Sequence, residues 1–225
     1  MIDRAVLEPL LDGAQVTVRV TLLAAMLGTA MSIVSGLAAL SPWFAVRWLN
    51  RTYVEFFRGT SAIVQLFWIF FALPLFGPSF SAIEAAVVTL GLNMGSYGSE
   101  VVRGSIRAVP GGQTEAAIAL NLGAWHRMRY IVFPQALVGM LPPYGNLLIE
   151  LLKGTALVSL ITLSDLTFEA QKLRVNGTAS TTQIFVTVLI MYFAIALAIT
   201  GLVRAAERFF GRGLEVGRGA RVRAS

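Results

Sequence analysis

The sequence predicts an all-α membrane protein with five transmembrane helices in one domain, 1–225. Of its 225 residues, 56% are hydrophobic and only 13% are charged, whereas soluble domains contain about 25% charged residues. The apolar residues come in long blocks, which indicates contact with lipid. A membrane helix needs roughly 20 predominantly apolar residues. Five stretches fit this requirement, at about 20–46, 59–76, 83–102, 131–153 and 181–203.

The first span contains no charged residue and is too long for the core of a signal peptide. Acidic residues precede it, at Asp3, Glu8 and Asp12. A signal peptide begins with basic residues instead, so we expect an uncleaved helix.

Two spans contain residues that affect helix packing. Small residues at Gly28, Ser32 and Gly36 in the first span form a stripe suited to close helix contact. We expect this stripe to pack within the chain. The fourth span contains Pro142-Pro143, which removes two backbone donors, so we expect that helix to bend or break there.

Five spans place the two termini on opposite sides of the membrane, and basic residues concentrate on cytoplasmic loops. Segments 47–58 and 103–129 and the tail after Val203 contain thirteen Arg, whereas the other side contains five Lys or Arg. This count predicts the amino terminus outside and the carboxyl terminus in the cytoplasm. The same bias explains the net charge of +6 without nucleic acid. We expect the Arg-rich end, 211–225, to lie near anionic lipid headgroups.

The composition argues against enzymatic and metal chemistry. There is no cysteine, and His126 is the one histidine, so thiolate or histidine metal clusters and histidine-dependent triads are not expected. The sequence also lacks a G-x4-G-K-[ST] phosphate loop, a G-x-S-x-G elbow and an H-E-x-x-H pair. We therefore expect no catalytic residues, no metal and no cofactor.

The segment 110–130, between the third and fourth spans, is a charged, helix-forming stretch on the predicted cytoplasmic side. After a Gly-Gly break, Thr114 is suited to cap a helix whose first turn contains Glu115, where the helix dipole favours a negative charge. Asn121 can adopt the left-handed conformation that ends a helix. A short helix between membrane spans is a surface that a cytoplasmic protein can push. The alternative is a plain loop with a stray helix.

This segment resembles the EAA loop of ABC importer permeases, whose pattern is E-A-A-x3-G-x9-I-x-L-P. Residues 115–117, Ile131 and Pro134 fall in register with it, whereas Asn121 replaces the glycine and Phe133 replaces the leucine. The resemblance implies a coupling helix from Glu115 to about Gly123 that docks into a groove on an ATP-binding subunit. The residues given this role are Glu115, Ala116, Ala117, Leu120, Asn121 and Gly123.

Three further segments resemble polar amino-acid uptake permeases, the family with members for histidine, glutamate, glutamine, arginine and opines. Residues 58–66 (RGTSAIVQL) resemble R-G-T-P-x-x-V-Q-L, with serine in place of proline. Residues 97–104 (YGSEVVRG) resemble A-Y-x-x-E-I-x-R-G, and residues 151–159 (LLKGTALVS) resemble L-L-K-D-[ST]-S-L-V-S. The wording at 65–68 (QLFW) and 154–156 (GTA) is most similar to the ectoine and hydroxyectoine uptake branch.

The resemblance implies the transmembrane domain of a type I ABC importer in the bacterial inner membrane. ATP would be bound by a separate subunit. The implied partners are an ABC ATP-binding subunit, a second permease subunit (identical or different), an extracytoplasmic solute-binding protein and membrane lipid. The implied substrate is a polar amino acid or related zwitterion, with ectoine or hydroxyectoine first and glutamine, glutamate or arginine as alternatives. A stand-alone secondary carrier is a further alternative, but it needs titratable residues buried mid-span and usually an internal repeat, and neither is clear here.

Polar side chains inside membrane spans are costly and are candidates for function by default. Asn93, Tyr97 and Glu100 are spaced four and three apart, so they share one face of the third span. Such a stripe is typical of a bundle interior or a water path. Hydrogen bonds between membrane helices contribute only ~0.6 kcal/mol on average, so simple packing is the competing interpretation. The candidates for the solute path are Gln65, Asn93, Tyr97, Glu100, Asn146, Glu150 and Lys153.

Two of these candidates have charged neighbours in sequence. Glu150 and Lys153 are three residues apart, so we expect them to neutralise each other, either as an internal ion pair or as a pair for which a zwitterionic solute competes. We expect Glu100 to pair with Arg103 in the same way. An unpaired carboxylate would instead favour a cationic amino acid such as arginine.

Overall fold

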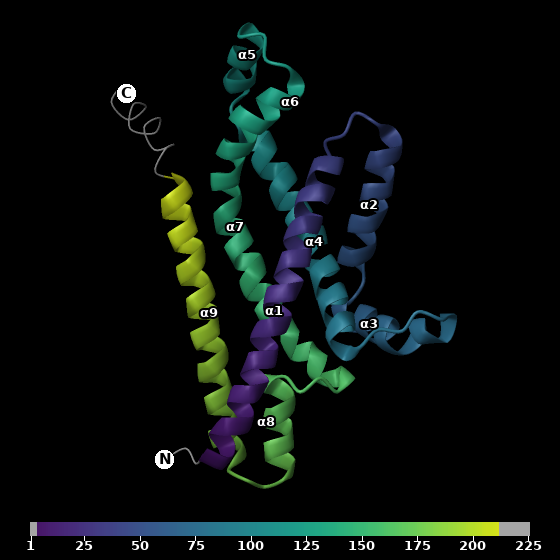
Figure 1. Ribbon diagram of the computed structural model, residues 1–225, viewed down its shortest axis with the longest axis vertical. Helices are drawn as coiled ribbons and strands as arrows, with labels where there is room; N and C mark the ends of the chain where they lie inside the picture. Colours follow the sequence, from purple (N-terminus) through teal and green to yellow (C-terminus); the bar gives the residue numbers. More distant parts are fainter. Residues whose placement is uncertain (1–3, 212–225) are drawn as a thin grey trace.

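The computed structural model describes residues 4–211, which form a bundle of helices joined by short turns, with no strand in that range (Figure 1). Three long helices form its centre: α1 (Arg4–Ala38), α4 (Ala82–Ala108) and α7 (Phe133–Gly154). A fourth, α9 (Thr181–Gly211), packs against α7 and the first half of α1. The predicted position of the tail lies outside the described residues, apart from Gly211.

Helices α1 and α4 lie close together over most of their length because small residues line their contact. A Cβ atom added at Gly28 would lie 3.0 Å from the sulfur of Met94, and one at Gly36 would lie 2.6 Å from Val102. Ser32 is fully buried and donates to the Gly28 carbonyl. The predicted small-residue stripe therefore packs within the chain, as expected.

The first two spans have different boundaries from those predicted. Helix α1 begins at Arg4 and ends at Ala38, and a separate helix α2 (Phe44–Gly59) follows. The predicted end of the first span at residue 46 is wrong, because α1 ends at Ala38. The charged residues of segment 47–58, which the sequence suggested to be a loop, lie on one face of α2. An exposed Arg51–Glu55 ion pair of 2.6 Å bridges one turn of that helix.

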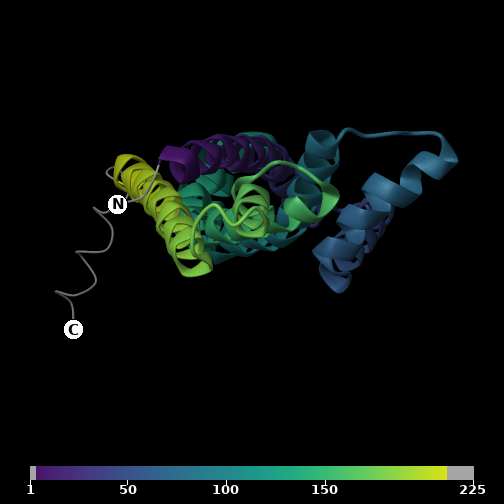
Figure 2. The same cartoon turned by 90° about the horizontal axis from the view of Figure 1, so that it is seen from below.

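Helix α2 continues into a second arm after a sharp corner. The arm consists of α3 (Ala62–Phe67), the π-helical η1 (Trp68–Ala72) and the 3-10 helix η2 (Leu73–Phe76). The two arms are bent by 103° relative to each other. Figure 2, seen from below, shows that this limb projects to one side of the bundle. The predicted span 59–76 is therefore only the second arm of a longer, bent unit.

The helix that contains Pro142 and Pro143 is continuous through both, so of the predicted bend or break the break does not occur. Proline is tolerated in membrane helices where neighbouring groups and local adjustments satisfy the freed backbone. Irregular turns lie at the two ends instead. A short helix α6 (Ala124–Arg127) and the π-helical η3 (Met128–Val132) precede α7, and the 3-10 helix η4 (Thr155–Ile161) follows it.

Helix α8 (Leu166–Val175) lies at the end of the bundle where α1 begins (Figure 1). The Asp165 side chain caps it by accepting from the backbone N–H groups of Phe168 at 2.9 Å and Thr167 at 3.2 Å. Burial raises the pKa of the Asp165 carboxyl to about 6, and these hydrogen bonds oppose the rise. An apolar cluster joins α8 to α1 and α9, formed by Val6, Leu10, Leu166, Ala170, Leu173, Ile184 and Val188.

Three helical runs in the described chain are each long and apolar enough to cross a membrane: α1, Ala124–Ile161 and α9. The bent unit of α2 and its second arm meets the same criterion as a pair. Helix α4 corresponds to the predicted span 83–102 and, at 27 residues, is about 40 Å long. It contains more polar residues, which it buries against α1, including Thr89, Ser96 and Ser99.

Candidate functional site

The segment predicted to contact an ATPase forms helix α5 (Gly111–Ala119) at one end of the bundle (Figure 1). The helix begins earlier than expected, and its first turn includes Gly111 and Gly112. The backbone N–H of Gln113 donates to the Pro110 carbonyl at 3.0 Å. The prediction that Thr114 caps the helix is therefore wrong, and Glu115 lies in the second turn.

The end of α5 follows the prediction. Asn121 has φ of 56°, in the left-handed region. Its N–H donates to the Ile118 carbonyl at 2.8 Å, and the Leu122 N–H donates to the Ala117 carbonyl at 3.0 Å. This hydrogen-bond pair is a Schellman motif, which satisfies carbonyls at a helix end. Gly123 then starts α6 as its N-cap residue.

The outer surface of α5 combines one charge with apolar side chains. Ala117 is buried, whereas Glu115 and Ala116 are exposed. Ile118 and Leu120 are 55% and 73% exposed. On the adjacent α6 and η3, Trp125 and Tyr130 are also exposed. Clustered exposed apolar side chains of this kind mark protein or membrane contacts.

Helix α5 is tied to the long helices on both sides. Two residues separate it from α4, and α6 and η3 connect it to α7 without a long loop. The Gln135 amide on α7 donates to the Gln113 side chain at 3.3 Å. Short connections and this hydrogen bond therefore join α5 to α4 and α7.

A small cavity of about 130 Å³ lies between α3, α4 and α7. It brings together three of the predicted solute-path residues: Asn93, Tyr97 and Glu150. The remaining lining is small or apolar and consists of Ala62, Leu90, Met94, Leu147, Leu151 and Gly154. The polar side chains that converge on this cavity are candidates for contact with a solute.

Gln65 is not part of the cavity lining, because its side chain holds the corner between α2 and α3. Its amide donates to the Phe57 carbonyl at 3.0 Å and to the Thr60 hydroxyl at 2.6 Å. Asn93 donates to the same Phe57 carbonyl at 3.0 Å. The two amides thus satisfy the backbone where the helix breaks, and Asn93 does so at the edge of the cavity.

The charged residues predicted for the solute path differ in whether they form ion pairs. Glu100 pairs with Arg103, as the sequence predicts. The predicted pairing of Glu150 with Lys153 is wrong: it is not among the ion pairs between residues 4 and 211. Spacing permits that contact, and both side chains are exposed, but only Glu150 is part of the cavity lining. Asn146 is exposed and also lies outside the lining.

Arg58 is not among the residues that the sequence predicts for the solute path, where it is one of the basic residues of segment 47–58. Arg58 lies at the end of α2, and its guanidinium carbon is 5.1 Å from the centroid of the Tyr97 ring. The sequence feature that could have pointed to Arg58 is its position in segment 58–66, which resembles a permease motif.

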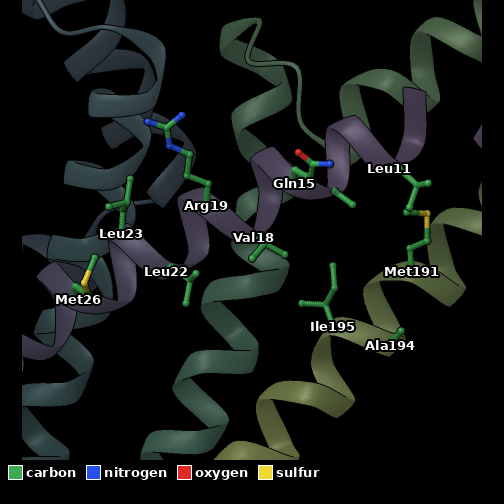
Figure 3. A pocket seen from close by; sticks show the side chains of 11 residues that line it. Leu11, Gln15, Val18, Arg19, Leu22, Leu23, Met26, Met191, Ala194 and Ile195 are labelled. Carbon is green, nitrogen blue, oxygen red and sulfur yellow. The ribbon is translucent and has the colours of Figure 1, made fainter. Parts of the chain in front are cut away.

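A larger groove of about 760 Å³ runs between α1 and α9 (Figure 3). Val18 and Leu22 of α1 and Ile195 of α9 point into it, whereas the guanidinium group of Arg19 extends away from Ile195. Apart from Gln15 and Arg19, its lining is apolar. This groove is better suited to contact the hydrocarbon chains of lipids than to bind a polar solute.

Helices long and apolar enough to cross a membrane, a small cavity between them and an exposed short helix at one end are the architecture of a membrane transport subunit. The chain belongs to the family of binding-protein-dependent transport system inner membrane components, whose model matches residues 28–212. It is therefore a multi-pass protein of the inner membrane and an amino-acid ABC transporter permease subunit.

Relatives support this assignment over most of the chain. A probable amino-acid ABC transporter permease of Sinorhizobium fredii is 45% identical over 207 residues, covering 89% of this chain and 87% of the relative. The glutamine transport system permease GlnP of Escherichia coli is 32% identical over 204 residues, covering 88% and 91%. A crystal structure of an amino acid ABC transporter with histidines has a TM-score of 0.81 at 33% identity, covering 89% and 93%. Family membership implies an ATP-binding subunit and further transporter components.

Proposed function

We propose that this permease subunit forms one half of a pair, with an identical or different second permease chain, in an ATP-driven importer. ABC ATP-binding subunits bind and hydrolyse the ATP, and an extracytoplasmic solute-binding protein delivers the solute. The chain itself uses no cofactor and contacts lipid but no nucleic acid. The pairing is supported by the argument that one such bundle offers too little surface to enclose a polar path, and in the described residues the cavity is lined by α3, α4 and α7.

In this proposal, α5 lies in the cytoplasm and docks into a groove of the ATPase. Its exposed Glu115, Ala116 and Leu120 make the contact, while Asn121 and Gly123 fix how the chain leaves the helix. The amino terminus and α8 then face the outside. The excess of Arg in segment 103–129 and in the tail after Val203 supports this orientation.

The observation that supports the solute path best is the cavity lined by Asn93, Tyr97 and Glu150. A carboxylate, an amide and a phenol suit a small solute that has hydrogen-bond donors as well as a cationic group. Ectoine or hydroxyectoine is our leading substrate, on the wording of residues 65–68 and 154–156. Glutamine and glutamate are alternatives, and glutamine is the solute in the name of one relative.

A cationic amino acid such as arginine is a second candidate for a specific reason. Glu150 lines the cavity without the Lys153 partner that spacing predicted. A carboxylate that is not neutralised within its own helix favours a solute with an additional positive charge.

We expect cells that lack other uptake routes, and that express this permease with its partner subunits, to accumulate labelled ectoine in preference to labelled glutamine and arginine. The measurement is initial uptake of each solute at equal concentration, with a strain lacking only this permease as the control. Uptake of arginine alone would contradict the ectoine assignment. It would support Glu150 as a carboxylate that is not neutralised within its own helix and binds a cationic solute. Uptake that persists without any ATPase subunit would contradict the importer itself.

A further inference from the structure

Arg58 is an exposed cation beside the cavity that Asn93, Tyr97 and Glu150 line. Its guanidinium carbon lies 5.1 Å from the centroid of the Tyr97 ring, and Tyr97 lines the cavity. Stacking on an aromatic face leaves the N–H groups at the guanidinium edge free to donate. None of the ion pairs between residues 4 and 211 includes Arg58. An anion of another molecule can therefore occupy that edge.

The surrounding backbone fixes the position of Arg58 relative to α4. On one side of it, Asn93 and Gln65 both donate to the Phe57 carbonyl, at 3.0 Å each. On the other side, Gln65 donates to the Thr60 carbonyl at 3.2 Å and to its hydroxyl at 2.6 Å. A guanidinium group placed on a fixed corner loses less freedom when it binds a ligand than one on a mobile loop.

The charges around the cavity are of opposite sign and come from different elements. Glu150 on α7 lines the cavity, and Arg58 at the end of α2 lies over Tyr97. Ala62, four residues after Arg58, belongs to the lining as well. A solute with a cationic and an anionic group matches this arrangement better than a solute with one charge.

We propose that Arg58, positioned by the Tyr97 ring, binds the carboxylate of the transported solute, while Glu150 faces its cationic group. This inference rests on the proposed function, since it assumes that the cavity holds the solute. A guanidinium fork binds a carboxylate through two parallel hydrogen bonds, which a lysine ammonium cannot reproduce. The substrate class is thus a small zwitterion with a free carboxylate, whatever its cationic group.

The test measures equilibrium binding to the detergent-purified complex of permease and ATPase, without the solute-binding protein. The probes are ectoine and two matched acid–amide pairs, L-arginine with L-argininamide and L-glutamine with L-glutaminamide. We expect the wild type to prefer the acid of a pair by about tenfold or more, the range of a hydrogen bond to a charged group. Arg58→Gln should reduce that preference to near unity by weakening only acid binding, and should weaken ectoine binding by a similar factor.

Two variants separate recognition from folding. Arg58→Lys should recover part of the acid preference, because it retains the charge without the fork. Arg51→Gln removes another exposed arginine of α2. This variant should bind ectoine and the acid and amide of each pair like the wild type. Unchanged acid preference in an assembled Arg58→Gln complex, or equal loss of acid and amide binding, would overturn the role of Arg58 alone. A wild type that binds none of the probes would contradict the proposed function, and this inference with it.

Discussion

Reversal of the charge at Glu115 should abolish uptake without preventing insertion or folding of the permease. Glu115 is exposed on α5, and substitutions at such surface positions usually change stability by less than about 0.5 kcal/mol. In the proposed complex, however, the side chain meets the ATPase. A lysine there places the wrong charge at an interface, and such mismatches cost several kcal/mol. We therefore expect Glu115→Lys to lower uptake and ATPase binding by about tenfold or more.

The measurement combines solute uptake with copurification of the ATPase subunit. Glu8→Lys is the matched control, because Glu8 is also an exposed glutamate but lies near the start of α1, at the end of the bundle away from α5. It should leave both readouts near the wild-type level. Normal uptake and normal ATPase copurification in Glu115→Lys would show that α5 is not the coupling helix.

Neutralising Glu150 should have the second large effect, and it distinguishes the structure from the ion pair that spacing suggests. Both side chains are exposed, but Glu150 is part of the cavity lining and Lys153 is not. We expect Glu150→Gln to reduce the apparent affinity for the transported solute by about tenfold, since a hydrogen bond to a charged group contributes about 1.5–3 kcal/mol. Lys153→Gln should have little effect. The measurement is the KM of uptake for each variant.

A stabilising Glu150–Lys153 pair gives a different pattern. Either single substitution would then leave one charge without its partner, so both variants should lose expression or uptake to a similar extent. Equal defects in Glu150→Gln and Lys153→Gln, repaired in the double variant, would refute the cavity role of Glu150.

The features that sequence predicted well depend on local chemistry. Asn121 ends α5 because asparagine tolerates the left-handed region, and that preference belongs to the residue itself. Glu100 pairs with Arg103 within a single helix. Long apolar stretches likewise specify α9 and most of α7, because the bilayer requires a minimum apolar length.

The features that sequence missed depend on distant neighbours. The charges of α2 suggested a loop, yet they occupy one face of a helix whose corner is held by amides of Gln65 and Asn93. Spacing allowed Glu150 to meet Lys153, but the packing of α3 and α4 against α7 makes a cavity that Glu150 lines instead. The placement of Arg58 over Tyr97 joins two helices far apart in sequence, which no local pattern encodes.

The central claim is that α5 is the cytoplasmic surface on which the ATPase acts, and a single introduced thiol tests it directly. The natural sequence contains no cysteine, so each variant has one reactive site. Ile118→Cys places it on the exposed face of α5, and Val175→Cys places it on α8 at the opposite end, where Val175 is 77% exposed. With a crosslinker that has one thiol-reactive end and one photoactivatable end added to membranes, we predict crosslinking to the ATPase subunit from position 118 and none from position 175. Crosslinking from position 175, or from neither position in an assembled transporter, would contradict the account.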